Sequence, residues 1–149
     1  KITEGVKAEK EQKNRDIKRL KTMDMIIEKS EINMPKMLVE SELNKMISEL
    51  GSNVAQMGLN IEGYLKHVNK TIEQLRADWT ADAEKRAKTQ LILNQIGVNE
   101  KLEPNEEEVK KEVEQIMKMY KDADRNRATI YIETMLINEE VWKILEGQK

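Results

Sequence analysis

The sequence predicts an all-α fold. Only two of its 149 residues are proline and six are glycine, so residues that end helices are rare and the helices should be long. Apolar residues recur at spacings of three and four, which is the pattern of one face of a helix. The nearest approach to a strand, Ile130 to Ile132, is too short to predict one.

The first predicted helix covers residues 1–29 and differs between its two halves. The first half is polar on every side, whereas the second half carries an apolar face made of Ile17, Leu20, Met23 and Ile27. A helix that is polar all round either bridges two domains or is barely stable alone. We therefore predict that residues 1–29 are a connector from another domain, leading into a single helical body over residues 30–149.

The second helix begins at Pro35, because proline is favoured in the first turn of a helix. It should end at Gly58, a typical stop signal. Between them lies an apolar stripe formed by Val39, Leu43, Met46, Leu50, Val54 and Met57. We expect Met46 and Met57, as members of this stripe, to lie in the core.

A short helix over residues 61–68 should follow, capped by Asn60. Thr71 and Gln74 then have the spacing of a capping box, which opens a long helix over residues 72–96. Every fourth residue of that helix belongs to one row: Leu75, Trp79, Ala83, Ala87 and Leu91. The two alanines should allow a neighbouring helix to come close, and we expect the tryptophan to be buried.

Two further helices complete the prediction. Asn105 and Glu108 are placed to form a reciprocal cap. The core face of the helix that they open comprises Val109, Val113, Ile116, Met117 and Tyr120. The last helix runs from about Asp124 to Leu145, and its apolar residues are Tyr131, Ile132, Met135, Leu136, Trp142 and Leu145.

The composition favours a large solvent-exposed surface around a small core. Charged residues make up 36% of the chain and apolar residues 38%, with two Trp, three Tyr, no Phe and nine Met. High charge is also typical of disorder, but the regular helical spacing argues against that reading. We expect an elongated helical body.

The same composition excludes several functions. The net charge is −2 without a basic stripe, which argues against direct binding of nucleic acid. No apolar run approaches the roughly 18 residues of a membrane span. There is no cysteine, which suits a reducing compartment and favours the cytoplasm. The sequence also shows no signal peptide, but it begins at Lys1, so we expect a fragment from which an upstream segment is missing.

No catalytic, metal or cofactor site is predicted. The only histidine, His67, lacks the partners of a metal site and should face solvent. Glu106, Glu107 and Glu108 suit the first turn of a helix, where the helix dipole favours negative charge. We therefore expect a protein that is not an enzyme and that needs no cofactor.

Several motifs in order resemble the C-terminal domain of the trigger factor family over about residues 15 to 145. They are Ile32-Asn33-Met34-Pro35 before Met37-Leu38-Val39-Glu40, then Gly58, Glu62, Tyr64 and Leu65, then Ala83 to Leu93, Ile96 to Leu102 and Asn105 to Val109. Between Tyr120 and Ile130 the chain is shorter than many members of the family. Arg86 matches the arginine of the third motif, where either a family role or an ion pair with a neighbouring helix would explain it.

The resemblance implies a helical body with two protruding arms that enclose a cradle for unfolded polypeptides. Members of the family also have a ribosome-binding domain and a peptidyl-prolyl isomerase domain, and this chain shows the signature of neither. The resemblance thus implies a ribosome-associated chaperone family whose isomerase activity belongs to a domain absent here. A periplasmic survival-type chaperone shares a similar helical core and stays open as a rival.

Methionine and tyrosine are the candidate binding residues. Flexible thioether side chains adapt to many apolar partners, so surfaces that bind many proteins over-use methionine. The residues predicted to hold unfolded polypeptide are Met25, Met37, Tyr64, Met119, Tyr120, Tyr131 and Met135. For each of them the alternative is ordinary packing in or beside the core.

The predicted function is that of an ATP-independent chaperone domain that binds unfolded or nascent polypeptides and delays their aggregation. Contact with the ribosome would occur only through the absent N-terminal domain, and a homodimer is left open. The alternative is a helical adaptor that docks one specific protein partner. Exposed apolar surface would favour the chaperone, and a uniformly charged exterior would favour the adaptor.

Overall fold

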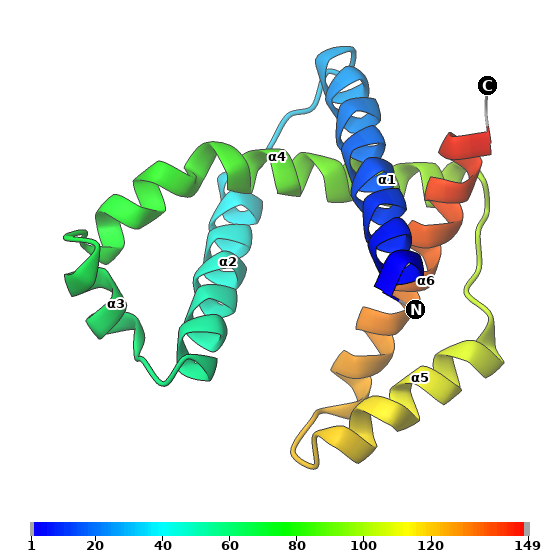
Figure 1. Ribbon diagram of the computed structural model, residues 1–149. Coiled ribbons are helices and arrows are strands. Elements are labelled where there is room, and N and C mark those ends of the chain that lie inside the picture. The colour runs from blue at the N-terminus through cyan, green and yellow to red at the C-terminus, as the bar shows by residue number, and fades with distance from the viewer. Residues whose placement is uncertain (1, 148–149) are drawn as a thin grey trace. The chain divides into compact units, whose positions relative to one another are not determined.

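The described part of the chain is built from helices alone, as the sequence predicts. The computed structural model describes residues 2–147, with side chains for residues 6–147. Within these residues there are six helices and no strand (Figure 1). They are α1 (Ile2–Glu28), α2 (Lys36–Gln56), α3 (Ile61–His67), α4 (Ile72–Asn99), α5 (Glu106–Met119) and α6 (Arg125–Gly147). The fold class is therefore all-α.

The chain divides into two compact units with the boundary after Gln90. The first unit holds α1, α2, α3 and most of α4, and the second holds the end of α4 with α5 and α6. The boundary falls inside α4, which is one continuous helix. Each unit is described by itself.

The division predicted from the sequence, a connector over residues 1–29 and a body over residues 30–149, stays a prediction. Its outermost positions, residue 1 and residues 148–149, lie outside the described residues.

In the first unit, α2 packs on α4 through a small apolar cluster. Leu43 and Met46 of α2 meet Ala83 of α4, and all three side chains are buried. Val39 and Trp79 pack against them and are half-buried. Trp79 is therefore less buried than predicted, because it lies at the margin of the cluster and not inside it. Figure 1 shows α3 returning the chain from the far end of α2 to the start of α4.

Three helices begin at the predicted capping residues, whereas α2 begins at Lys36, directly after Pro35, without a side-chain cap. The side chain of Asn60 accepts a hydrogen bond of 2.7 Å from the N–H of Gly63. The Thr71 hydroxyl accepts from the N–H of Gln74 (3.2 Å), and the Gln74 side-chain oxygen accepts from the N–H of Thr71 (2.9 Å), which completes the capping box. Asn105 accepts from two backbone N–H groups of the first turn of α5, at 3.0 and 3.1 Å. Among the described residues Glu108 makes no side-chain hydrogen bond back to Asn105, so only half of the predicted reciprocal cap forms.

Three helices end in the same hydrogen-bond pattern. After α2, the N–H of Gly58 donates to the carbonyl of Ala55 and the N–H of Leu59 donates to that of Val54, at 3.0 and 2.9 Å. Gly58 has a φ of 75°, in the left-handed region that this Schellman motif requires. The same bonds follow α3 and α4, where Asn69 and Lys101 each adopt a φ of 52°.

Two predicted core residues lie just beyond the ends of their helices and are exposed. Met57 follows the last residue of α2, and Tyr120 follows the last residue of α5. Their exposed fractions are 76% and 65%. The apolar periodicity runs on past the point where the helix stops, so both positions leave the buried face. The core predictions for Met57 and Tyr120 were wrong for this reason.

In the second unit, α5 and the first half of α6 lie side by side as a hairpin (Figure 1). One apolar cluster lies between them. Its buried members are Val109, Val113, Ala128 and Ile132, and Ile116, Met117 and Leu136 pack against them. The helices are joined by a short connection, in which the Asp124 carboxylate accepts a hydrogen bond of 3.0 Å from the N–H of Arg127. This bond caps α6 at its predicted start.

The end of α4 crosses α6 closely at a glycine. A Cβ atom at Gly97 would lie 2.9 Å from Cγ2 of Ile137, which is closer than real Cβ contacts. Val141, one turn further along α6, is completely buried at the same crossing. Gly97 therefore permits the approach of the two helices in the second unit.

Candidate polypeptide-binding surfaces

In the first unit, two of the three predicted binding residues are exposed. Met25 lies on α1 and Met37 in the first turn of α2, where its exposed fraction reaches 78%. Tyr64 on α3 is half-buried, so part of its ring is unavailable to a partner. The predicted role of the three in binding polypeptide stays a prediction.

In the second unit, all four predicted residues are exposed. Met119 and Tyr120 follow one another at the end of α5. Tyr131 and Met135 are four residues apart on α6, so their side chains share one helix face. In each unit the predicted residues thus lie on more than one helix, and the cradle itself stays a prediction.

Sequence reasoning missed three exposed apolar residues that neighbour these predicted residues. Leu38 follows Met37 at the start of α2, and Leu59 lies two residues after Met57 beyond its end. Ile130 precedes Tyr131 on α6. For Leu38 and Leu59 the signal was position, because they lie at and beyond the ends of the apolar stripe of α2. Ile130 lies inside α6 and gave no such signal.

The exposed apolar face of α1 is a further difference from the sequence prediction. Met23 is buried, with an exposed fraction of 2%, but Ile17 and Leu20 on the same predicted face are exposed. Val6 adds an exposed apolar side chain nearer the start of the helix. Only the last part of α1 therefore contributes to the core of the first unit.

A shallow hollow of about 270 Å³ lies along the α5–α6 hairpin. Its floor is formed by the buried Val109 and Val113, and its rim includes Glu106, Lys110, Arg125 and Glu133. An apolar floor with a charged rim suits a polypeptide segment that buries one side chain and keeps its backbone near polar groups.

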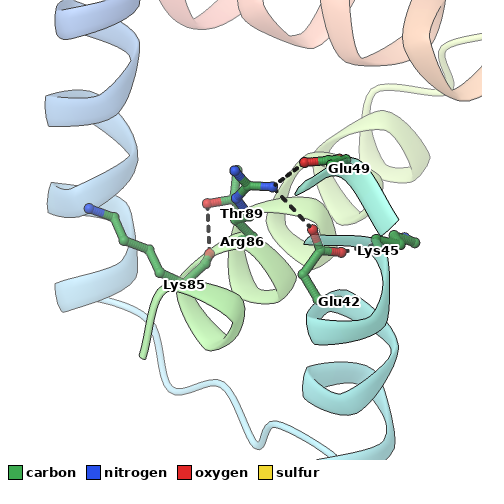
Figure 2. A network of polar contacts seen from close by, with 6 residues as sticks. All are labelled: Glu42, Lys45, Glu49, Lys85, Arg86 and Thr89. Atoms are coloured by element: carbon green, nitrogen blue, oxygen red, sulfur yellow. Dashed lines mark hydrogen bonds and ion pairs between the residues drawn. The ribbon is translucent and has the colours of Figure 1, made fainter. Parts of the chain in front are cut away.

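A polar network beside the α2–α4 contact accounts for Arg86 (Figure 2). The guanidinium Nη1 of Arg86 lies 3.3 Å from Glu49 and 3.9 Å from Glu42, both on α2. Glu42 also pairs with Lys45 at 3.4 Å. Arg86 thus bridges two helices, in agreement with the structural explanation of its place in the motif. Exposed pairs of this kind contribute about 0.2–1 kcal/mol each.

Two further polar bridges join helices of the first unit. Arg76 of α4 forms an ion pair with Glu40 of α2 and donates a hydrogen bond of 2.8 Å to the side-chain oxygen of Asn44. Lys85 of α4 pairs with Asp24 of α1 at 2.6 Å. The first unit is thus held by charged side chains as well as by its apolar cluster.

Among the residues that the structure describes, the pKa is shifted clearly for Glu73 and Lys143, and both shifts arise from helix geometry. Hydrogen bonds from the backbone at Glu73 itself and from the Thr71 side chain lower the pKa of the Glu73 carboxyl. A hydrogen bond to Glu140, together with the negative charge of that residue, raises the pKa of Lys143. Both groups are exposed and lie at a helix start and on a helix surface. Neither shift indicates a group prepared for proton transfer.

The described residues show neither a candidate metal site nor a candidate membrane-spanning helix. His67 is exposed, as predicted, and no group of three or more potential His, Cys, Asp or Glu ligands is found among the residues that the structure describes. None of the helices in this part of the chain is both long and apolar enough to cross a membrane. What the described surface offers instead is exposed apolar side chains set among charges.

Comparison with known proteins places this helical chain in a family. A family model described as "Bacterial trigger factor protein (TF) C-terminus" matches residues 1–146. No solved structure matches the chain.

Curated relatives agree with the family model. The trigger factor of Clostridium kluyveri is 30% identical over 131 residues, which is 83% of this chain and 30% of that protein. The trigger factors of Bacillus thuringiensis and Bacillus anthracis are each 33% identical over 119 residues, 80% of this chain and 27% of theirs. The chain thus spans less than a third of the length of these relatives. With nearly all of its residues matched by the family model, the chain belongs to the bacterial trigger factor C-terminus family, a family of chaperone-related domains.

Proposed function

We propose that this chain is an ATP-independent chaperone domain that binds unfolded or nascent polypeptides and delays their aggregation. One observation carries the proposal. Among the described side chains, fourteen apolar residues are buried and fourteen large apolar residues are exposed. Three of the buried residues are alanines, so more large apolar residues are exposed than are fully buried. A helical chain with this distribution has surface to offer an apolar partner.

The physical basis of the proposed binding is that a client covers exposed apolar surface without a closely fitting interface. Covering apolar surface contributes about 25 cal/mol per Å² before the costs of ordering the partner. The exposed residues lie in small groups, so each contact with a client is weak and several act together. Weak contacts let the client leave and fold without hydrolysis of a nucleotide.

Five of the exposed residues are methionines, namely Met25, Met37, Met57, Met119 and Met135. A methionine side chain has three rotatable bonds and a polarisable sulfur, so one surface can adapt to clients of different shape. This supports a general chaperone over an adaptor for one partner, because a specific interface uses residues of fixed shape.

The wider role follows from the relatives and is part of the same proposal. Ribosome contact and prolyl isomerase activity would belong to parts of the longer relatives that this chain does not span. We expect the chain to act in the cytoplasm and to show no prolyl isomerase activity in a protease-coupled assay on a proline peptide.

The decisive experiment measures aggregation of several unrelated unfolded proteins with and without the chain. A several-fold molar excess should delay aggregation of most of them, with the same delay in the presence and absence of ATP. Failure with every client would overturn the proposal. Protection of a single client would favour the adaptor.

A matched triple variant connects the activity to the surface. Met37, Met119 and Tyr131 are all exposed, so replacing them by Ser should change the free energy of unfolding by less than about 0.5 kcal/mol each. Client binding should weaken because apolar contact area is lost. Replacing three exposed polar residues, Glu9, Ser52 and Glu114, by Ala should leave client binding unchanged.

A further inference from the structure

The methionines of this chain fall into three classes of side-chain exposure, of which Met34 and Met117 form the middle, half-buried class. Met25, Met37, Met57, Met119 and Met135 are exposed, with fractions from 39% to 78%. Met23 and Met46 are buried at 2% and 7%. The chain contains no cysteine, so these thioethers are its only sulfur atoms. Oxidants that react with sulfur therefore meet the exposed methionines first.

Four of the five exposed methionines lie within four residues of another exposed apolar residue. The neighbouring pairs are Met37 with Leu38, Met57 with Leu59, Met119 with Tyr120, and Met135 with Tyr131. The first two pairs flank the ends of α2, and the other two belong to α5 and α6. The most oxidisable atoms of the chain thus lie within the apolar surface available to a client.

We propose that these five methionines are oxidation sites through which two-electron oxidants, such as hydrogen peroxide, reversibly weaken polypeptide binding. The inference rests on the proposed function. The thioether sulfur attacks one peroxide oxygen, the O–O bond breaks, a sulfoxide forms and water leaves. Sulfur is oxidised by two electrons and the peroxide is reduced.

The consequence for binding follows from polarity. A sulfoxide is a polar hydrogen-bond acceptor, so covering it with an apolar client is unfavourable. Covering the unoxidised thioether, in contrast, favours client binding. Methionine sulfoxide reductases return the thioether, which makes the change reversible.

The fold should survive the first stage of oxidation. All five exposed sulfurs lie outside the described clusters, whereas Met46 packs with Leu43 and Ala83. Oxidation of Met46 would put a polar group into that cluster and loosen α2 from α4. Binding should therefore be lost before helical structure is lost.

The experiment treats the chain alone with graded hydrogen peroxide and removes the peroxide with catalase before a client is added. The client is a fluorescently labelled, permanently unfolded protein, and its Kd is measured by anisotropy. Peptide mass spectrometry should show the five exposed methionines oxidised before Met23 and Met46. At that stage circular dichroism should be unchanged, and the Kd should rise by about tenfold. Treatment with both sulfoxide reductases should restore it.

Two variants locate the effect. Replacing all five exposed methionines by Leu conserves volume and apolarity, so the untreated Kd should stay within about twofold and peroxide should no longer raise it. The matched control, Met23→Leu with Met46→Leu, should respond to peroxide like the unaltered chain.

The outcomes separate the inference from the proposed function. An unaltered chain that binds the client equally well before and after the five sulfurs are oxidised overturns the inference alone. The inference is also overturned if peroxide treatment raises the client Kd of the five-leucine variant as much as that of the unaltered chain. An untreated chain that does not bind the client overturns the proposed function and, with it, the effect on affinity.

Discussion

The contact of α2 with α4 and the hairpin of α5 with α6 hold two helices together in different ways. The first combines three buried apolar residues with ion pairs from Arg76 and Arg86. The second has four buried apolar residues and three more packed against them. The hairpin also carries charged side chains on the rim of its hollow, such as Lys110 and Arg125. Among the described residues, these rim charges form no ion pair.

This difference separates two sources of stability. Apolar burial is insensitive to moderate salt, whereas exposed ion pairs contribute little and are screened as the salt concentration rises. We therefore expect the hairpin to depend on its apolar side chains alone. The α2–α4 contact should respond to both side-chain size and ionic strength.

The largest expected effect is in the hairpin. Ile132 is 3% exposed inside the cluster, so Ile132→Ala should lower the free energy of unfolding of the second unit by about 2–5 kcal/mol. Ile130, two residues away, is exposed, and Ile130→Ala should change it by less than about 0.5 kcal/mol. Denaturant melts give the magnitude, and hydrogen exchange should show the loss in α5 and α6. Equal effects of the two changes would contradict the assigned core.

The next effect tests the margin of the α2–α4 cluster. Trp79 is half-buried, so Trp79→Ala should cost about 1–3 kcal/mol, less than the 3–5 kcal/mol of a fully buried large aromatic. Hydrogen exchange should show weaker protection in α2 and in the first half of α4. A loss at the upper end of the buried range would mean that Trp79 is a central member of the cluster.

A smaller pair of effects compares two helix ends. Gly58 and Lys101 occupy the same left-handed position after α2 and α4. Gly58→Ala should destabilise by about 1 kcal/mol, and Lys101→Gly should stabilise by up to about 1 kcal/mol, because only glycine adopts this conformation without a steric cost. Thermal melts of both variants check the opposite signs. Two changes of the same sign would contradict the shared motif.

The smallest effect concerns the charged bridges. Arg86→Gln removes the pairs with Glu49 and Glu42, so it should cost about 0.2–1 kcal/mol at low salt and less at about 1 M salt. The control is Arg125→Gln on the rim of the hairpin hollow, which should change stability little at either salt concentration. A cost that is unchanged by salt would show that Arg86 acts through packing of its side-chain stem.

Local signals in the sequence predicted most of the helix boundaries. Asn60, Thr71, Gln74 and Asn105 cap helices as expected, because a capping side chain bonds to backbone only two or three residues away. The stop at Gly58 follows from its left-handed conformation. The same stop at Lys101 has no such signal, because lysine takes this conformation only where the surrounding structure imposes it.

Burial was harder to predict than helix position. Periodicity identifies the apolar face of a helix but not how far the neighbouring helix extends along it. Met46 is covered by α4, whereas Met57, on the same stripe, lies beyond the end of α2. For the same reason, periodicity showed neither the exposure of Ile17 and Leu20 on α1 nor the close crossing at Gly97. These features depend on contacts between residues far apart in the sequence.

The boundary of the first unit has a consequence for the order of events during synthesis. The contacts that define this unit, from Asp24 with Lys85 to Leu43 with Ala83, all close within the first ninety residues. A ribosome makes the chain from its N-terminus, so these partners emerge from the ribosome before the α5–α6 hairpin does. The first unit can therefore fold vectorially, ahead of the second, with α4 lengthening as later residues emerge.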